Sequence, residues 1–168
     1  ANILSEVSCF LGSDGVLSSS VFGGNPPYHY LWLDNNLDTL SFQEDAIDLK
    51  YGMYTLYVTD SFECGPAVDS VFLSQRAEIS INLLEKKDNI CFNDNHGELI
   101  FDVSGGTPKY NLYAVNEENQ NFSTNSNYLK NLPSSNYSVW VEDSLLCISD
   151  TLFNFNKYPS PASIFDIV

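Results

Sequence analysis

The sequence contains four cysteines, whose chemistry is either a disulfide framework or a metal site. They are Cys9, Cys64, Cys91 and Cys147. No two of them form a Cys-x-x-Cys pair and the chain has only two histidines, so a zinc site is disfavoured. Disulfides are the expected chemistry, and they predict an oxidising compartment.

Oxygen-bearing side chains in turns form a second group, which could bind a hard cation such as Ca²⁺. Asp94 lies in the oxygen-rich segment 93–98, and Asp14 lies in the matching turn near the start of the chain. The spacing does not fit the twelve-residue loop of an EF-hand. Asn and Asp also favour tight turns for local reasons. We therefore expect no cofactor and keep Asp14 and Asp94 as the calcium alternative.

No group of residues in the sequence predicts catalysis. The chain has no Gly-x-Ser-x-Gly element. His29 falls within a predicted strand and His96 within a turn, while Glu44 and Asp45 lie in a polar connection. Because nucleophilic and acid–base mechanisms need such groups to converge, we predict that the protein is not an enzyme.

The charge balance limits the partners that the protein can bind. Seven Lys and Arg stand against 22 Asp and Glu, which gives a net charge of -15 at pH 7. Such a surface repels nucleic-acid phosphates and anionic lipid headgroups. No apolar run reaches the length of a membrane-spanning helix. We expect neither nucleic-acid binding nor membrane insertion.

An internal repeat supplies the elements that must position these residues. The segment 21–28, Val-Phe-Gly-Gly-Asn-Pro-Pro-Tyr, recurs 82 residues later at 103–110 as Val-Ser-Gly-Gly-Thr-Pro-Lys-Tyr. The element Leu-x-x-Gly-x-Tyr at 49–54 recurs 83 residues later at 132–137 as Leu-x-x-Ser-x-Tyr. Several landmarks in the same order indicate a tandem duplication.

The duplication predicts the domain organisation. We expect one domain over residues 1–76 and a second over 77–160, with residues 161–168 opening a third copy. The cysteines follow the same register, because Cys9 matches Cys91 and Cys64 matches Cys147.

Of the three pairings open to four cysteines, the duplication favours the two that lie within one copy. These pairs are Cys9–Cys64 and Cys91–Cys147, and each would close a loop of about 55 residues.

Each copy reads as a series of short strands. Segments 28–33 and 54–59 alternate with period two, and Gly, Pro, Asn and Asp mark the turns between strands. No stretch shows helical spacing with caps at both ends. Tyr54 and Tyr137 fit a tyrosine corner, in which the hydroxyl binds the backbone a few residues upstream. The prediction is an all-β protein of two tandem immunoglobulin-like Greek-key sandwiches.

These landmarks together resemble the SprB repeat of gliding, surface-adhesive Bacteroidetes. The first copy carries the pattern nearly throughout, from Cys9 through the Gly-Gly-x-Pro-x-Tyr and Leu-x-x-Gly-x-Tyr elements to Cys64. The second copy departs from it, because Leu112 and Ala114 replace a Tyr and a Trp, and Ser135 replaces a Gly.

The resemblance implies a structural and adhesive stalk repeat of a large adhesin involved in surface attachment and gliding motility. Such proteins are secreted by a type IX system and displayed at the outer cell surface. Adjacent repeats of the same chain are the implied partners, and surface polysaccharide is a further one. The alternative is a carbohydrate-binding module on the same fold. Tyr57 and Trp140 are then the candidate ligand contacts, since alternation places both on the outward face of equivalent strands.

Overall fold

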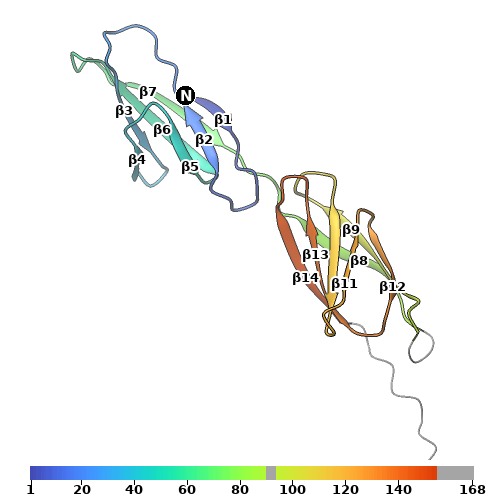
Figure 1. Cartoon of the computed structure of the whole chain (residues 1–168). Coiled ribbons are helices and arrows are strands. Elements are labelled where there is room, and N and C mark those ends of the chain that lie inside the picture. The colour runs from blue at the N-terminus through green and yellow to red at the C-terminus, as the bar shows by residue number, and fades with distance from the viewer. Residues whose placement is uncertain (90–93, 155–168) are drawn as a thin grey trace, which may run out of the picture. The chain divides into compact units, whose positions relative to one another are not determined.

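The computed structural model describes residues 1–89 and 94–154, and within them the chain forms strands and no helix. The chain divides into two compact units, Ala1–Ala77 and Glu78–Val168 (Figure 1). The prediction of an all-β protein is confirmed. Residues 161–168, expected to open a third copy, lie outside the described residues.

The first unit consists of seven strands in two antiparallel sheets. The strands are β1 (Asn2–Ser5), β2 (Gly15–Ser18), β3 (His29–Leu33), β4 (Thr39–Ser41), β5 (Ala46–Leu49), β6 (Gly52–Thr59) and β7 (Ala67–Leu73). One sheet has the order β1-β2-β5 and the other the order β4-β3-β6-β7. A parallel bridge joins Val7 to Gln75, just beyond the end of β7. Two such sheets face to face are the architecture of an immunoglobulin-like sandwich.

The second unit repeats this topology strand for strand. Its strands are β8 (Ser80–Lys87), β9 (Gly97–Ser104), β10 (Asn111–Asn116), β11 (Asn121–Thr124), β12 (Tyr128–Leu132), β13 (Asn136–Glu142) and β14 (Ile148–Asn154). The sheets have the orders β12-β9-β8 and β11-β10-β13-β14. Each strand of the second unit therefore has a counterpart in the first, in the same place in its sheet.

The core of the first unit lies between its two sheets. Strand β6 alternates inward and outward, so Tyr54, Leu56 and Val58 are buried. Trp32 on β3 is completely buried, as expected of the core tryptophan of such a sandwich.

In the second unit the large core side chain comes from the facing sheet. Ala114 stands at the position of Trp32 and is buried, while the fully buried Phe101 stands at the position of Ser19. A large side chain lost from one sheet is thus matched by one gained on the facing sheet. This exchange keeps the interior filled, as the close packing of protein cores requires.

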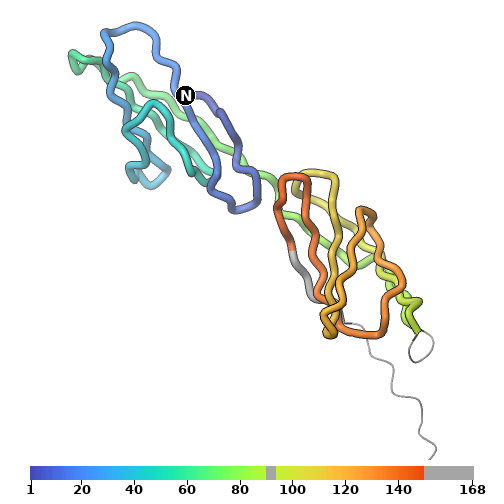
Figure 2. Tube along the Cα trace, viewed as in Figure 1, coloured from blue at the N-terminus to red at the C-terminus, as the bar shows by residue number. Residues whose placement is uncertain are grey.

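The loops of each unit gather at its two ends. In the first unit the segment between β1 and β2 lies at the downstream end, where β7 finishes and the chain continues to the second unit (Figure 2). The β6–β7 loop lies at the opposite, upstream end, because Val58 pairs with Ala67 there. In the second unit the β13–β14 loop lies at the upstream end, where β8 begins.

Candidate functional site

The tyrosines of the Leu-x-x-Gly-x-Tyr element bind the backbone four residues upstream. The hydroxyl of Tyr54 donates to the carbonyl oxygen of Lys50 at 2.6 Å, and that of Tyr137 donates to Pro133 at 2.7 Å. Burial raises the pKa of Tyr137 to about 12 and also raises the pKa of Tyr54. Both phenols therefore remain protonated donors at physiological pH. This is the geometry of a tyrosine corner.

A second pair of tyrosines makes a similar bond that the sequence analysis missed. The hydroxyl of Tyr28 donates to Gly23 at 2.7 Å, and that of Tyr110 donates to Gly105 at 2.6 Å. Each bond closes a Gly-Gly-x-Pro-x-Tyr loop on itself across five residues. The sequence contained a sign of this bond, because the Tyr recurs in both copies at the same distance from the Gly pair.

An aspartate after β6 and its counterpart after β13 fasten two loops together. One carboxylate oxygen of Asp60 accepts from the backbone amides of Phe62 and Cys64 at 3.0 Å, and the other accepts from Asn25 at 3.2 Å. These bonds, that from Cys64 foremost, lower the pKa of Asp60. Asp60 thus links the β6–β7 loop to the Gly-Gly-x-Pro-x-Tyr loop.

Asp143 makes the same three kinds of bond in the second unit. It accepts from Leu145 at 2.8 Å, from Cys147 at 2.9 Å and from Thr107 at 2.7 Å. Asp143 is only 1% exposed. Both aspartates therefore bind backbone amides of two loops that are distant in the sequence.

The cysteines do not form the predicted pair in the first unit. Cys64 is an exposed free thiol, whereas Cys9 and Cys147 are each disulfide-bonded. The prediction of a Cys9–Cys64 bond is therefore wrong. Cys91, predicted to pair with Cys147, lies outside the described residues.

The physical reason is the length of the strand that separates Cys9 from Cys64. Cys9 lies at the downstream end, where the Val7 amide donates to Ser74, and Cys64 lies in the β6–β7 loop at the upstream end. The eight residues of β6 span about 23 Å, because a strand rises about 3.3 Å per residue. The Cα atoms of a disulfide lie within about 7 Å of each other.

The calcium candidates are engaged in local bonds. Asp14 accepts a hydrogen bond from the backbone amide of Ser8 at 3.0 Å, and bonds from the side chain and backbone of Ser8 lower the pKa of Asp14. Asp94 pairs with the imidazole of His96. Within residues 1–89 and 94–154, no three His, Cys, Asp or Glu side chains form a group that could hold a metal ion.

The candidate contact residues Tyr57 and Trp140 lie on outward sheet faces, one in each unit, and both are half-buried. Trp140 stacks on Tyr113, its direct cross-strand neighbour, with ring centroids 5.6 Å apart and an interplanar angle of 15°. Tyr57 has Leu31 and Val68 as its cross-strand neighbours. An aromatic pair is thus present on the second unit, at a place where the first unit has one aromatic ring between aliphatic neighbours.

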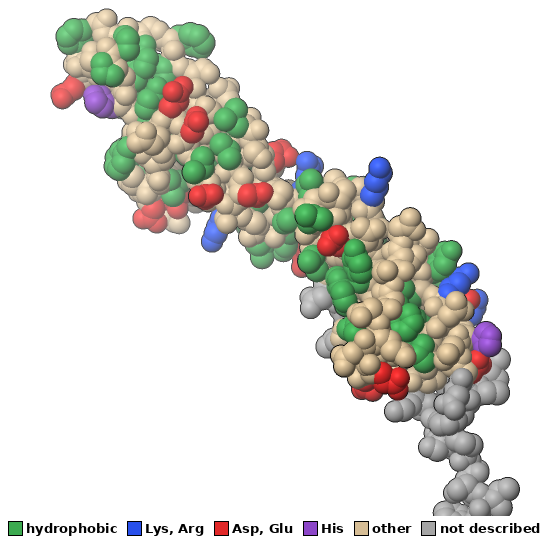
Figure 3. Space-filling model, in the orientation of Figure 1, with side chains coloured by type: hydrophobic (Ala, Val, Ile, Leu, Met, Phe, Trp, Pro, Cys, Tyr) green, Lys and Arg blue, Asp and Glu red, His purple; other side chains and the backbone are tan. Residues whose placement is uncertain are grey.

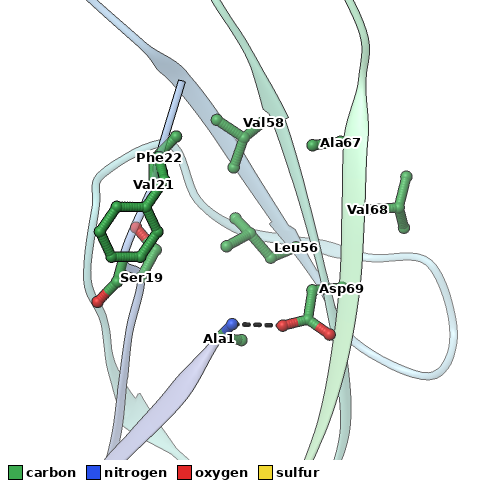
Figure 4. A pocket seen from close by; sticks show the side chains of 10 residues that line it. Ala1, Ser19, Val21, Phe22, Leu56, Val58, Ala67, Val68 and Asp69 are labelled. Carbon is green, nitrogen blue, oxygen red and sulfur yellow. Dashed lines mark hydrogen bonds and ion pairs between the residues drawn. The ribbon is translucent and has the colours of Figure 1, made fainter. Parts of the chain in front are cut away.

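A cavity lies in the first unit where the two sheets part (Figure 4). Its volume is about 170 Å³, and its lining includes Leu56, Val58 and the largely exposed Phe22. The amino group of Ala1 forms an ion pair with Asp69 across it at 2.5 Å. Pockets for small-molecule ligands usually measure about 300–1,000 Å³, so this cavity is small for such a site.

The surface carries acidic and apolar side chains side by side. Asp and Glu side chains are spread over the visible face among exposed hydrophobic groups (Figure 3). Phe42, Phe62 and Phe72 are among the exposed large hydrophobics of the first unit. In the part of the chain that the structure describes, no helix has the length and apolar character needed to cross a membrane.

Comparison with known proteins gives a family match for the first part of the chain. Residues 1–37 match the family described as the SprB repeat. No curated protein matches the chain.

Among solved structures, the chain is similar to the three N-terminal domains of the highly immunogenic outer capsid protein (Hoc) of bacteriophage RB49. The TM-score is 0.56 at 20% identity, over 89% of this chain and 57% of that one. The chain therefore spans somewhat over half of that structure. A weaker likeness, with a TM-score of 0.40 at 11% identity, links it to an amphioxus IgVJ-C2 molecule, over 90% of this chain and 100% of that one. At such identities the Hoc likeness bears on the fold alone, which is immunoglobulin-like.

Proposed function

Because residues 1–37 are of the SprB-repeat type, we propose that this chain is a structural and adhesive stalk segment of a large secreted adhesin. The family is one of cell-surface repeats associated with adhesion and gliding motility. In this proposal both units serve as spacers that hold an adhesive surface away from the cell and take part in surface attachment. Type IX secretion would deliver the whole protein to the outer surface.

The observation that carries the proposal is how the recurring polar residues are used. Tyr28, Tyr54 and Asp60 bind backbone groups of their own unit, and their counterparts in the second unit do the same. These recurring side chains thus stabilise the loops of each unit, a use that suits a spacer domain. Immunoglobulin-like and repeat domains of this kind are typically structural rather than enzymatic.

The strongly negative net charge is compatible with dense display of many copies of the protein on a cell surface. A net charge of -15 on 168 residues keeps neighbouring chains apart and in solution. The disulfide-bonded Cys9 and Cys147 agree with an oxidising environment. We further propose that adjacent repeats are the direct partners, without a cofactor.

Labelling of intact cells tests the surface location. Antibodies raised against the purified chain are expected to label intact host cells as strongly as permeabilised ones. Antibodies against a cytoplasmic protein of the same host provide the control. Labelling that appears after permeabilisation alone would rule out a surface stalk.

A carbohydrate-binding module is the second candidate, and the stacked pair Tyr113 and Trp140 is the observation that favours it. Aromatic rings on an open sheet face can stack on sugar rings. A ligand that binds the folded state raises the melting temperature, whereas a pure spacer is unaffected. We expect no shift with a panel of bacterial and host polysaccharides. A shift that Trp140→Ala removes and Tyr57→Ala retains would instead establish a glycan site on the second unit.

A further inference from the structure

One edge of the first unit has a stretch of backbone that no strand covers. The β1–β2 ladder starts where Asn2 faces Ser18. Residues 19–22 continue from β2 beyond that pair, but they belong to no strand, and no ladder partner faces them within the described residues. The sheet edge is therefore open along 19–22.

The second unit shows what can lie against such an edge. The segment that matches 19–22 is 101–104, which forms the last part of β9. The first half of β8 pairs with it, and Ile81 faces Val103 there. Ile81 is buried, as is Ile79 just before β8 begins. Aliphatic side chains at alternate positions of this segment thus enter the core of the second unit.

The matched glycine loops show that the corresponding place in the first unit is empty of described residues. A Cβ at Gly105 would lie 1.8 Å from the carbonyl oxygen of Glu78 and 3.3 Å from the Cα atom of Ile79. A Cβ at Gly23, the matching glycine, meets nothing within 4 Å. The first unit therefore has room where the second unit holds the segment that leads into β8.

The cavity of the first unit lies along this open edge. Val21 and Phe22 lie on one side of it, and Leu56, Val58 and Ala67 lie on the other (Figure 4). The cavity volume of about 170 Å³ is small for a free ligand. When a strand adds to a sheet edge, however, only its alternate side chains enter the interior, and its backbone stays at the edge. Such an occupant suits a small apolar cavity.

A buried hydroxyl in the wall of the cavity lacks a partner. Ser19 lines the cavity and is 6% exposed, and its Oγ has no hydrogen-bond partner within the described residues. The fully buried Phe101 stands at the matching position of the second unit. Because buried polar groups are nearly always hydrogen-bonded, the unpartnered Ser19 indicates that the first unit is incomplete at this point.

We propose that this groove, formed by 19–22 with Leu56, Val58 and Ala67, accepts an extended strand that carries aliphatic side chains at alternate positions. The strand is supplied by the connection to a neighbouring repeat, as residues 77–83 are supplied to the second unit. It pairs antiparallel with 19–22, and its alternate side chains enter the cavity. The source of the strand rests on the proposed function in a repeat array, whereas the capacity of the groove to bind a strand does not.

A synthetic peptide with the sequence of residues 77–83, blocked at both ends, tests the groove on the whole chain. The second unit already holds this segment, so its own matching place is filled. We expect the peptide, titrated to millimolar concentration, to raise the melting temperature of the first unit saturably by at least about 4 °C. The emission of Trp32 in a Trp140→Phe background follows the first unit alone.

Hydrogen exchange shows where the peptide binds. The amides of 19–22 should exchange at least about tenfold more slowly when the peptide is bound, because a paired strand protects them. The amides of the β3–β4 turn, residues 34–38, should be unaffected. Slow exchange of 19–22 in the free chain that increases with chain concentration would show that a second copy fills the groove, and would overturn the assignment to a neighbouring repeat.

Matched controls separate insertion into the groove from unspecific binding. A peptide with Asp in place of Ile79 and Ile81 should have no effect. Val21→Asp places a carboxylate at the groove and should abolish the effect of the wild-type peptide, whereas Phe22→Asp, at a position that is 92% exposed, should retain it. If the wild-type chain shows neither the shift nor the slower exchange, or if the Asp peptide acts equally, the groove does not accept a strand and the proposal is wrong.

Fusion of residues 77–83 directly before Ala1 tests supply of the strand within one chain. Ala1 then stands at the position of Leu84, since Asn2 matches Glu85 in the two ladders. We expect the fused chain to show the raised melting temperature without free peptide and to bind no further peptide. A fused chain that still binds the free peptide would contradict supply from a neighbouring repeat. None of these results depends on surface labelling of intact cells, which tests the proposed function separately.

Discussion

At the scale of single residues, hydroxyl and carboxylate groups determine how the loops of each unit are held. Tyr54 and Tyr137 donate to part-buried backbone carbonyl groups four residues upstream. A buried acceptor left without its donor costs about 1–3 kcal/mol. Small changes at these atoms should therefore have measurable effects on stability.

Removal of the corner hydroxyl tests this argument directly. We expect Tyr54→Phe to lower the free energy of unfolding of the first unit by about 1–2 kcal/mol, since the carbonyl of Lys50 loses its donor. Urea unfolding followed by the emission of Trp32, in a Trp140→Phe background, reports on this unit alone. Tyr57→Phe on the same strand is the matched control and should change the unfolding free energy by less than about 0.5 kcal/mol. Equal effects of the two variants would contradict a special role for the corner.

The lowered pKa of Asp60 gives a prediction for pH. Hydrogen bonds favour the ionised carboxylate in the folded state, so its pKa lies below the ordinary value of 3.8. The stability that Asp60 contributes is present above that value and is lost as the pH falls through the folded pKa. We expect the urea midpoint of the first unit to fall more steeply below pH 4 in the wild-type chain than in Asp60→Asn.

The comparison of these two pH profiles removes the contributions of other acidic groups. Parallel profiles for the wild type and Asp60→Asn would show that the loop bonds do not depend on the charge of Asp60.

At the scale of elements, equivalent loops in the two units do not tolerate the same changes. Gly23 and Gly105 occupy matched positions with φ of 82° and 79°. A Cβ at Gly23 meets nothing within 4 Å, whereas one at Gly105 would lie 1.8 Å from the carbonyl oxygen of Glu78. The backbone conformation is shared, but the surroundings are not.

Substitution of each glycine by alanine separates the cost of the left-handed backbone from the cost of a steric collision. Gly23→Ala should cost about 1–2 kcal/mol, the penalty of a left-handed conformation for a residue with a Cβ. Gly105→Ala meets the same penalty and a backbone collision, so we expect a loss at least about 2 kcal/mol larger. Unfolding followed by Trp32 for the first variant and by Trp140 for the second measures each effect in its own unit. Similar losses would mean that the loop of the second unit moves aside freely.

Most of the strand layout could be predicted from the sequence, because the duplication marks the same turns twice. The period-two alternation predicted for 54–59 is confirmed, since Leu56 and Val58 are buried and the residues between them are less so. The sequence did not predict that Phe101 replaces Trp32 as the large core residue. The two residues come from non-equivalent positions on facing sheets, and the sequence alone does not show that these positions are in contact. The Cys9–Cys64 pairing failed for a related reason. Sequence register identifies equivalent positions, but the end of the sandwich that each loop occupies depends on the three-dimensional path of the strands.

At the scale of the whole molecule, the net charge of -15 opposes the compact state through self-repulsion. Salt screens this repulsion, since the Debye length falls from about 30 Å at 0.01 M to about 8 Å at 0.15 M ionic strength. Measuring stability against salt concentration also tests whether Asp14 and Asp94 bind calcium. Screening depends on ionic strength alone, whereas a bound ion stabilises according to its own concentration.

We expect NaCl and CaCl₂ at equal ionic strength to raise the melting temperature of the chain by the same few degrees, about 2–5 °C between 0.01 and 0.15 M. The carboxylate of Asp14 already accepts hydrogen bonds from Ser8, and Asp94 is paired with His96. Calcium would compete with these partners for the carboxylate oxygens. A calcium site would show itself as an additional rise that saturates with CaCl₂ and disappears in Asp14→Asn or Asp94→Asn. Because Asp14 lies in the first unit and Asp94 in the second, emission of Trp32 and of Trp140 would show which unit binds the ion.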